Sequence, residues 1–159
     1  SYRIIKKIVE QEKDSGFDDH EVKARMLTQL SRAELGLGQI DSAFINADEA
    51  CKILQNNQYN NSANINVEYA AALVAKADVL LYKSMFTDAM QAYSKAEAVY
   101  LNRYGNHYYN VDDVAYLLFQ GVCAASKNKN NFWKKHFCKQ IQKFNNKNYL
   151  ITKALIYCN

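Results

Sequence analysis

The residues that most often carry catalysis or bind metals are few and scattered along this chain. Its histidines and cysteines are His20, His107, His136, Cys51, Cys123, Cys138 and Cys158. A zinc site on a helix needs ligands three or four residues apart, and no pair of Cys or His has that spacing here. His136 and Cys138 are two residues apart, which points them to different faces of a helix. The sequence therefore predicts no metal site and no cofactor.

Motifs for nucleophilic catalysis and phosphate binding do not occur locally either. A Cys–His pair would have to be assembled from distant parts of the chain, and that alternative stays open. Gly36-Leu37-Gly38 is not followed by the Lys-Ser/Thr that completes a phosphate-binding loop. We therefore expect a protein that is not an enzyme.

The cysteines and the lack of long apolar runs bear on location. The four cysteines show no close pairing pattern, so we interpret them as free, mostly buried thiols in a reducing compartment. No apolar run approaches the roughly 18 residues that a membrane span needs. Together these features predict a cytoplasmic protein. The chain begins at Ser1 rather than Met, which predicts a processed product or an excised piece of a longer protein.

Charge is distributed unevenly. The net charge is −4 up to Asp113 and +8 after it, because eight lysines and no acidic residue follow Asp113. Lys135, Lys139 and Lys143 form one helical stripe, opposite the apolar stripe of Trp133, Phe137 and Ile141. With Lys134, these lysines form a candidate patch for an acidic protein, a membrane surface or nucleic acid. The alternative is a solvated convex surface in a lysine-rich chain.

The elements that must position these residues are helices. The chain has 49% hydrophobic residues, no Pro and five Gly, so little interrupts helix formation. Apolar residues recur at steps of three and four. We expect about seven or eight helices, in units of about residues 22–65, 66–110 and 111–145, flanked by helices at 2–13 and 147–158. One domain of 1–159 accommodates them all.

The central pair of helices, expected at about 65–83 and 86–104, defines the repeated unit. Only a few residues separate these helices, which predicts an antiparallel hairpin. Tyr93 is predicted to insert between them, with Ala77 and Ala89 at close approach. The same unit recurs, because 46 residues separate Ala24 from Ala70 and 45 separate Ala70 from Ala115. A nearly constant period with two helices per unit indicates a helical solenoid.

The residues at the junctions of these units resemble the tetratricopeptide repeat, most closely the long repeats of kinesin light chains, whose second helix ends in Gly-x-x-His-Pro-x-Val-Ala. The matching stretches are Asp19 to Ala24, Tyr104-Gly105-Asn106-His107 and Asp113-Val114-Ala115. No proline follows either histidine, and Ser84-Met85-Phe86 replaces the family's Gly-x-Tyr turn. The resemblance covers about residues 15–145. It implies an all-α, right-handed superhelix that binds proteins without catalysing a reaction.

The resemblance also implies a concave groove, formed by the first helix of each unit, that holds a peptide or protein segment. Alignment of the repeats places eight residues in it, namely Arg25, Thr28, Gln29, Arg32, Val74, Asp78, Tyr82 and Gln120. Arg32 favours an acidic peptide. The family's clamp for a C-terminal carboxylate needs Lys and Asn where this chain has Thr28, Arg32 and Ala75, so we do not expect that ligand class.

The expected last helix, 147–158, carries more apolar residues than one contact can bury. Leu150, Ala154 and Tyr157 share one side, while Ile151 and Leu155 widen the apolar surface. We expect Leu155 or Ile151 to contact a further segment of a parent protein or a second copy in a homodimer. The alternative is a helix that tilts into the end of the stack and buries most of its surface.

Overall fold

The computed structural model describes residues 2–15, 20–56, 63–104, 111–143 and 149–159, and these ranges contain helices and short turns but no strand. The helices are α1 (Tyr2–Ser15), α2 (His20–Gly36), α3 (Ile40–Asn56), α4 (Ala63–Tyr82), α5 (Phe86–Tyr104), α6 (Val111–Lys127), α7 (Asn131–Gln142) and α8 (Tyr149–Cys158). The all-α prediction is confirmed. The expected central helices agree with α4 and α5 to within two residues.

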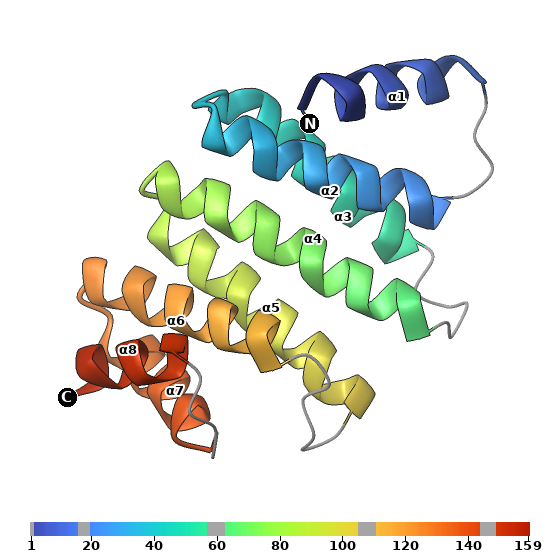
Figure 1. Cartoon of the computed structure of the whole chain (residues 1–159). Helices are drawn as coiled ribbons and strands as arrows, with labels where there is room; N and C mark the ends of the chain where they lie inside the picture. Colours follow the sequence, from blue (N-terminus) through green and yellow to red (C-terminus); the bar gives the residue numbers. More distant parts are fainter. Residues whose placement is uncertain (1, 16–19, 57–62, 105–110, 144–148) are drawn as a thin grey trace.

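Each helix packs against its neighbours in the chain, in order from α1 to α7. Figure 1 shows α1 at one end of the molecule and α7 with α8 at the other, so the two termini are far apart. The most extensive contacts are within the pairs α2–α3 and α4–α5. The helix α8 returns to pack on both α6 and α7.

Three turns, between α2 and α3, α4 and α5, and α6 and α7, have the same backbone structure. Each contains one residue with positive φ, namely Gly38 at 77°, Ser84 at 60° and Lys129 at 52°. In each turn the following N–H donates to the carbonyl five residues earlier, as in Gln39 to Glu34, at 2.8 to 2.9 Å. This is the Schellman ending of a helix. The turns are 46 and 45 residues apart, the same spacing as the sequence repeat.

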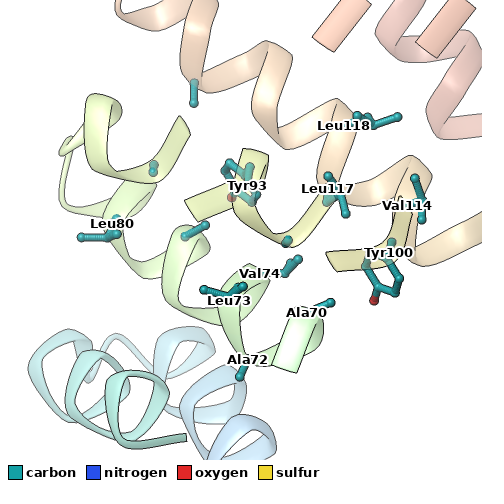
Figure 2. Close-up of a cluster of buried hydrophobic side chains, with 14 of the residues drawn as sticks. Ala70, Ala72, Leu73, Val74, Leu80, Tyr93, Tyr100, Val114, Leu117 and Leu118 are labelled. Atoms are coloured by element: carbon teal, nitrogen blue, oxygen red, sulfur yellow. The ribbon is translucent and has the colours of Figure 1, made fainter. Parts of the chain in front are cut away.

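The core follows the prediction made for the central pair. Tyr93, Ala77 and Ala89 are fully buried. Figure 2 shows Tyr93 of α5 within a cluster that includes Val74 of α4 and Leu117 of α6. The repeated alanines Ala24, Ala70 and Ala115 are also fully buried, in the first helix of each pair.

The free-thiol prediction is wrong for two of the four cysteines. A disulfide joins Cys138 of α7 to Cys158 of α8, across 20 residues of sequence. Cys51 and Cys123 are free thiols. The pairing was missed because it depends on how α8 returns against α7, which no local spacing indicates. A disulfide of this kind is typical of an oxidising compartment.

The helix α8 differs from its prediction in the face that it exposes. Ile151 is buried and Leu155 is partly buried against the core, so neither is the surplus apolar residue that we expected. The reason is that α8 packs on two helices, α6 and α7, so that Ile151 and Leu155 face the core. The exposed large apolar residues of α8 are instead Tyr149, Ile156 and Tyr157.

Within the described ranges, every helix is too short or too polar to cross a bilayer.

Candidate functional site

The structure brings part of the predicted groove together and removes two residues from it. Arg25, Gln29, Arg32 and Tyr82 are exposed, Asp78 and Gln120 are half-buried, and Thr28 and Val74 are buried. The hydroxyl of Thr28 donates to the carbonyl of Ala24 at 2.9 Å, so this side chain turns back onto its own helix. Val74 belongs to the hydrophobic core between α4 and α6 (Figure 2). Placing Thr28 and Val74 on the groove surface was therefore wrong.

A surface cleft of about 480 Å³ lies where α2, α4 and α6 meet. Its lining residues are Arg32, Leu35 and Gly36 from α2, Asp78 from α4, and Asp113 and Tyr116 from α6. Two of the predicted groove residues, Arg32 and Asp78, thus lie in one cleft. Each of the three helices is the first helix of a pair, so the cleft forms on the side of the molecule on which the groove was predicted.

Asp78 is the centre of a hydrogen-bond network in this cleft. Its carboxylate accepts hydrogen bonds from the hydroxyl of Tyr93 and, at 2.9 Å, from the hydroxyl of Tyr116. The amide of Gln120 donates to the Tyr116 oxygen at 3.2 Å. Burial raises the pKa of Asp78, and the hydrogen bonds and the Arg32 charge offset this only in part. The network fixes α4, α5 and α6 relative to one another.

Arg32 is placed beside two carboxylates. Its guanidinium lowers the pKa of both Asp78 and Asp113, although burial is the larger effect and leaves both pKa values raised. The cleft therefore contains one cation and two carboxylates that burial has made harder to ionise.

Arg25 is engaged in a similar way. Its Nε donates to Glu68 on α4 at 2.8 Å, and a terminal guanidinium nitrogen pairs with Glu21 at 3.1 Å. This side chain bridges α2 and α4. Because two carboxylates already match its charge, Arg25 adds little positive potential to the cleft side of the molecule.

The lysine patch is present but less uniform than predicted. Lys135, Lys139 and Lys143 are exposed at the outer side of α7, whereas Lys134 is half-buried. Phe137 and Ile141 are fully buried on the opposite side, as the stripe pattern predicted. In the described part of the chain, no carboxylate lies within salt-bridge distance of these four lysines, and the charge of Lys143 acts to lower the pKa of the nearby Glu97.

Sequence reasoning missed Asp113 and Tyr116 as cleft residues. The signal was available for Tyr116, because it is 45 residues after Ala71 and 91 after Arg25, at the same position of the repeat. The pairing of His136 with Glu97 was also missed. Its Nε2 lies 2.9 Å from Glu97 Oε2, and burial raises the pKa of this glutamate. His20 is exposed, and His107 lies outside the described residues.

The described residues offer neither a metal site nor a reactive thiol. Among the residues that the structure describes, no three His, Cys, Asp or Glu side chains are grouped so that they could hold a metal ion. Burial raises the pKa of the Cys51 thiol to about 12 and also raises that of Cys123. Neither free cysteine is therefore a reactive thiolate near neutral pH.

Comparison with known proteins does not narrow the range of possible functions. No protein-family model matches the sequence, and no curated protein matches it.

Proposed function

We propose that this protein is a non-catalytic interaction module, a tetratricopeptide-like solenoid that binds a peptide or protein segment along the side formed by α2, α4 and α6. The observation that carries the proposal is the cleft of about 480 Å³ at which these three helices converge. The three matching turns and the constant repeat spacing support the solenoid assignment.

The chemistry of the cleft suits a peptide better than a small apolar molecule. Its lining offers a guanidinium, two carboxylates and a tyrosine hydroxyl, beside the apolar side chain of Leu35. A bound segment could exchange hydrogen bonds with these groups while its own side chains fill the space between the helices. The Asp78 network keeps Tyr116 in place before binding, which lowers the entropy cost of association.

The charge balance revises one expectation. Arg25 and Arg32 each lie beside two carboxylates, so they do not make this side of the molecule positive. We therefore no longer favour an acidic peptide as the ligand. The cytoplasmic location also stays a prediction, and the disulfide between Cys138 and Cys158 argues for an oxidising compartment instead.

The test is affinity capture from the source cell with matched variants. Asp113→Lys together with Tyr116→Ala changes the cleft, while Asp88→Lys with Thr87→Ala changes exposed residues at the start of α5. We expect the cleft variant to lose a specific partner that the wild type and the α5 variant both retain. A partner that all three capture equally would place the binding site elsewhere.

A second candidate function is binding of an anionic partner through the lysines of α7. The observation in its favour is that Lys135, Lys139 and Lys143 are exposed and form no ion pair with a described carboxylate. Binding through phosphates should weaken steeply as salt concentration rises, whereas peptide binding in the cleft should change little. This difference separates the two candidates in one titration.

A further inference from the structure

The outer side of α7 combines an exposed aromatic ring with the row of lysines. Phe132, Lys135, Lys139 and Lys143 follow one another at steps of three or four residues, so they lie on one side of the helix. Phe132 is 75% exposed, the highest fraction among the exposed large apolar side chains of the described residues. Its ring contacts the half-buried Trp133, with the two ring centroids 5.7 Å apart.

The neighbouring helix α8 exposes three further large apolar residues, Tyr149, Ile156 and, at 48%, Tyr157. Tyr149 is 74% exposed and Ile156 is 71% exposed, and their separation of seven positions places both on one side of α8. The two helices pack on each other and are joined by the Cys138–Cys158 disulfide. Figure 1 shows them together at the end of the molecule farthest from α1.

We propose that this end of the protein docks on an anionic lipid bilayer. The residues concerned are Phe132, Lys135, Lys139, Lys143, Tyr149 and Ile156, which we call the terminal face. The inference rests on the second function proposed above, binding of an anionic partner, and it names that partner as lipid.

The composition of the terminal face distinguishes a bilayer from nucleic acid. Lysines would serve either partner, because both present phosphate groups. Ile156 has no aromatic ring to stack on a base, but it gains free energy by leaving water for the boundary between headgroups and acyl chains. Aromatic residues such as Phe132 and Tyr149 are also favoured at that boundary. The lysine chains can lie along the apolar region while their ammonium groups contact the headgroups.

A peripheral protein needs both charge attraction and buried apolar side chains for stable attachment to a bilayer. Charge attraction alone is weakened by salt, and a few exposed apolar side chains alone bind a bilayer only weakly. The disulfide keeps α8 against α7, so the apolar residues of α8 and the lysines of α7 belong to adjacent helices at the same end of the molecule.

The experiment measures sedimentation of the protein with vesicles of phosphatidylcholine and phosphatidylserine, and with vesicles of phosphatidylcholine alone. The test variant is Lys135→Gln, Lys139→Gln and Lys143→Gln combined. The matched control is Arg3→Gln, Lys6→Gln and Lys7→Gln combined, which removes the same charge from exposed residues of α1 at the other end of the molecule. Thermal melts establish that both variants are folded.

We expect wild type and the α1 variant to bind the anionic vesicles, and neither to bind the neutral ones. The α7 variant should lose affinity on the order of a hundredfold, because each lysine near an anionic surface contributes a factor of about five. Equal losses in both triple variants, or no difference between the two vesicle types, would overturn the proposal.

The contribution of the apolar side chains to vesicle binding is tested by the variants Phe132→Ser and Ile156→Ser. These changes should weaken vesicle binding several-fold without altering its dependence on salt, because they remove no charge. Trp133 is the only tryptophan, and its contact with Phe132 makes its fluorescence a reporter of docking. Vesicles should therefore change the emission of wild type but not that of the lysine variant.

A parallel titration with duplex DNA separates this inference from the function on which it rests. DNA binding that needs the α7 lysines, with no vesicle binding, would keep the anionic-partner function and refute the lipid assignment. Absence of binding to both would refute the two together. An unchanged affinity of the Phe132→Ser and Ile156→Ser variants for vesicles would also count against a bilayer.

Discussion

A single carboxylate shows how strongly the surroundings of a residue determine its role. Asp78 was predicted as a ligand-facing residue of the groove, and it does line the cleft. It also accepts hydrogen bonds from Tyr93 and Tyr116, which lie on two other helices. The same oxygen atoms therefore serve the stability of the fold and the polarity of the cleft. This double role makes the protonation of Asp78 measurable in the free energy of unfolding.

We predict that Asp78 stabilises the fold more at low pH than at neutral pH. Burial raises its pKa above 3.8, so its contribution is fully present below about that pH and is lost as the pH rises through the raised value. The free energy of unfolding of wild type, minus that of Asp78→Asn, should therefore fall between pH 4 and pH 7. The loss is about 1.4 kcal/mol for each unit by which the pKa is raised.

Asp48 provides the control with the opposite sign. Burial acts to raise its pKa, but hydrogen bonds from Lys52 and Lys76 outweigh this and lower it. Its contribution is thus present above the unfolded pKa and lost as the pH falls through the lowered value. In urea unfolding, the difference between wild type and Asp78→Asn should fall as the pH rises above about 3.8, whereas the difference between wild type and Asp48→Asn should be constant there and should fall as the pH drops below about 3.8. Parallel trends would contradict the assigned environments.

At the scale of the element, the turns explain how the hairpins could be found from the sequence. The period of 46 and 45 residues and the position of Gly38 already indicated where each helix pair turns. The helices α4 and α5 were placed correctly because both are long, at 20 and 19 residues, and only a short turn separates them. The groove residues were harder to predict, because consecutive residues of a helix differ by 100° in direction, and this step decides whether Thr28 or Gln29 faces the core. This ambiguity led to the wrong placement of Thr28 and Val74 on the groove surface.

Ser84 gives a prediction at this scale. It has a φ of 60°, a conformation that costs a residue with a side chain about 1–2 kcal/mol, whereas the equivalent Gly38 adopts 77° without that cost. Glycine also loses more chain entropy on folding, which takes back about 0.5–1 kcal/mol. We therefore expect Ser84→Gly to stabilise the protein by about 0.5–1 kcal/mol in urea unfolding.

Gly38→Ala is the matched control for this experiment. A Cβ added at Gly38 would meet no atom within 4 Å, so any loss of stability must come from the backbone conformation alone. We expect a loss of about 1 kcal/mol. If Ser84→Gly and Gly38→Ala both changed stability in the same direction, the shared left-handed turn would not be the cause.

At the scale of the whole molecule, the end of the chain is where sequence reasoning failed. Local spacing predicted a helix near 147–158 and an excess of apolar residues on it, and both hold for α8. Which residues remain exposed depends on α8 packing against α6 and α7 at once, which is a property of the three helices together. The same packing brings Cys138 and Cys158 together. Neither consequence leaves a pattern within a single helix.

The disulfide therefore yields the last prediction, on the attachment of α8 to the rest of the molecule. A disulfide that closes a loop of 20 residues lowers the conformational entropy of the unfolded chain, which stabilises the folded state by about 3 kcal/mol. Reduction should therefore lower the free energy of unfolding of the wild type by about that amount. A variant with Cys138→Ser and Cys158→Ser should melt at the temperature of the reduced protein and be insensitive to reductant. Alkylation in denaturant without reductant should modify two thiols, Cys51 and Cys123. Four modified thiols in protein from its native compartment would mean that packing alone, without a covalent bond, holds α8 in place.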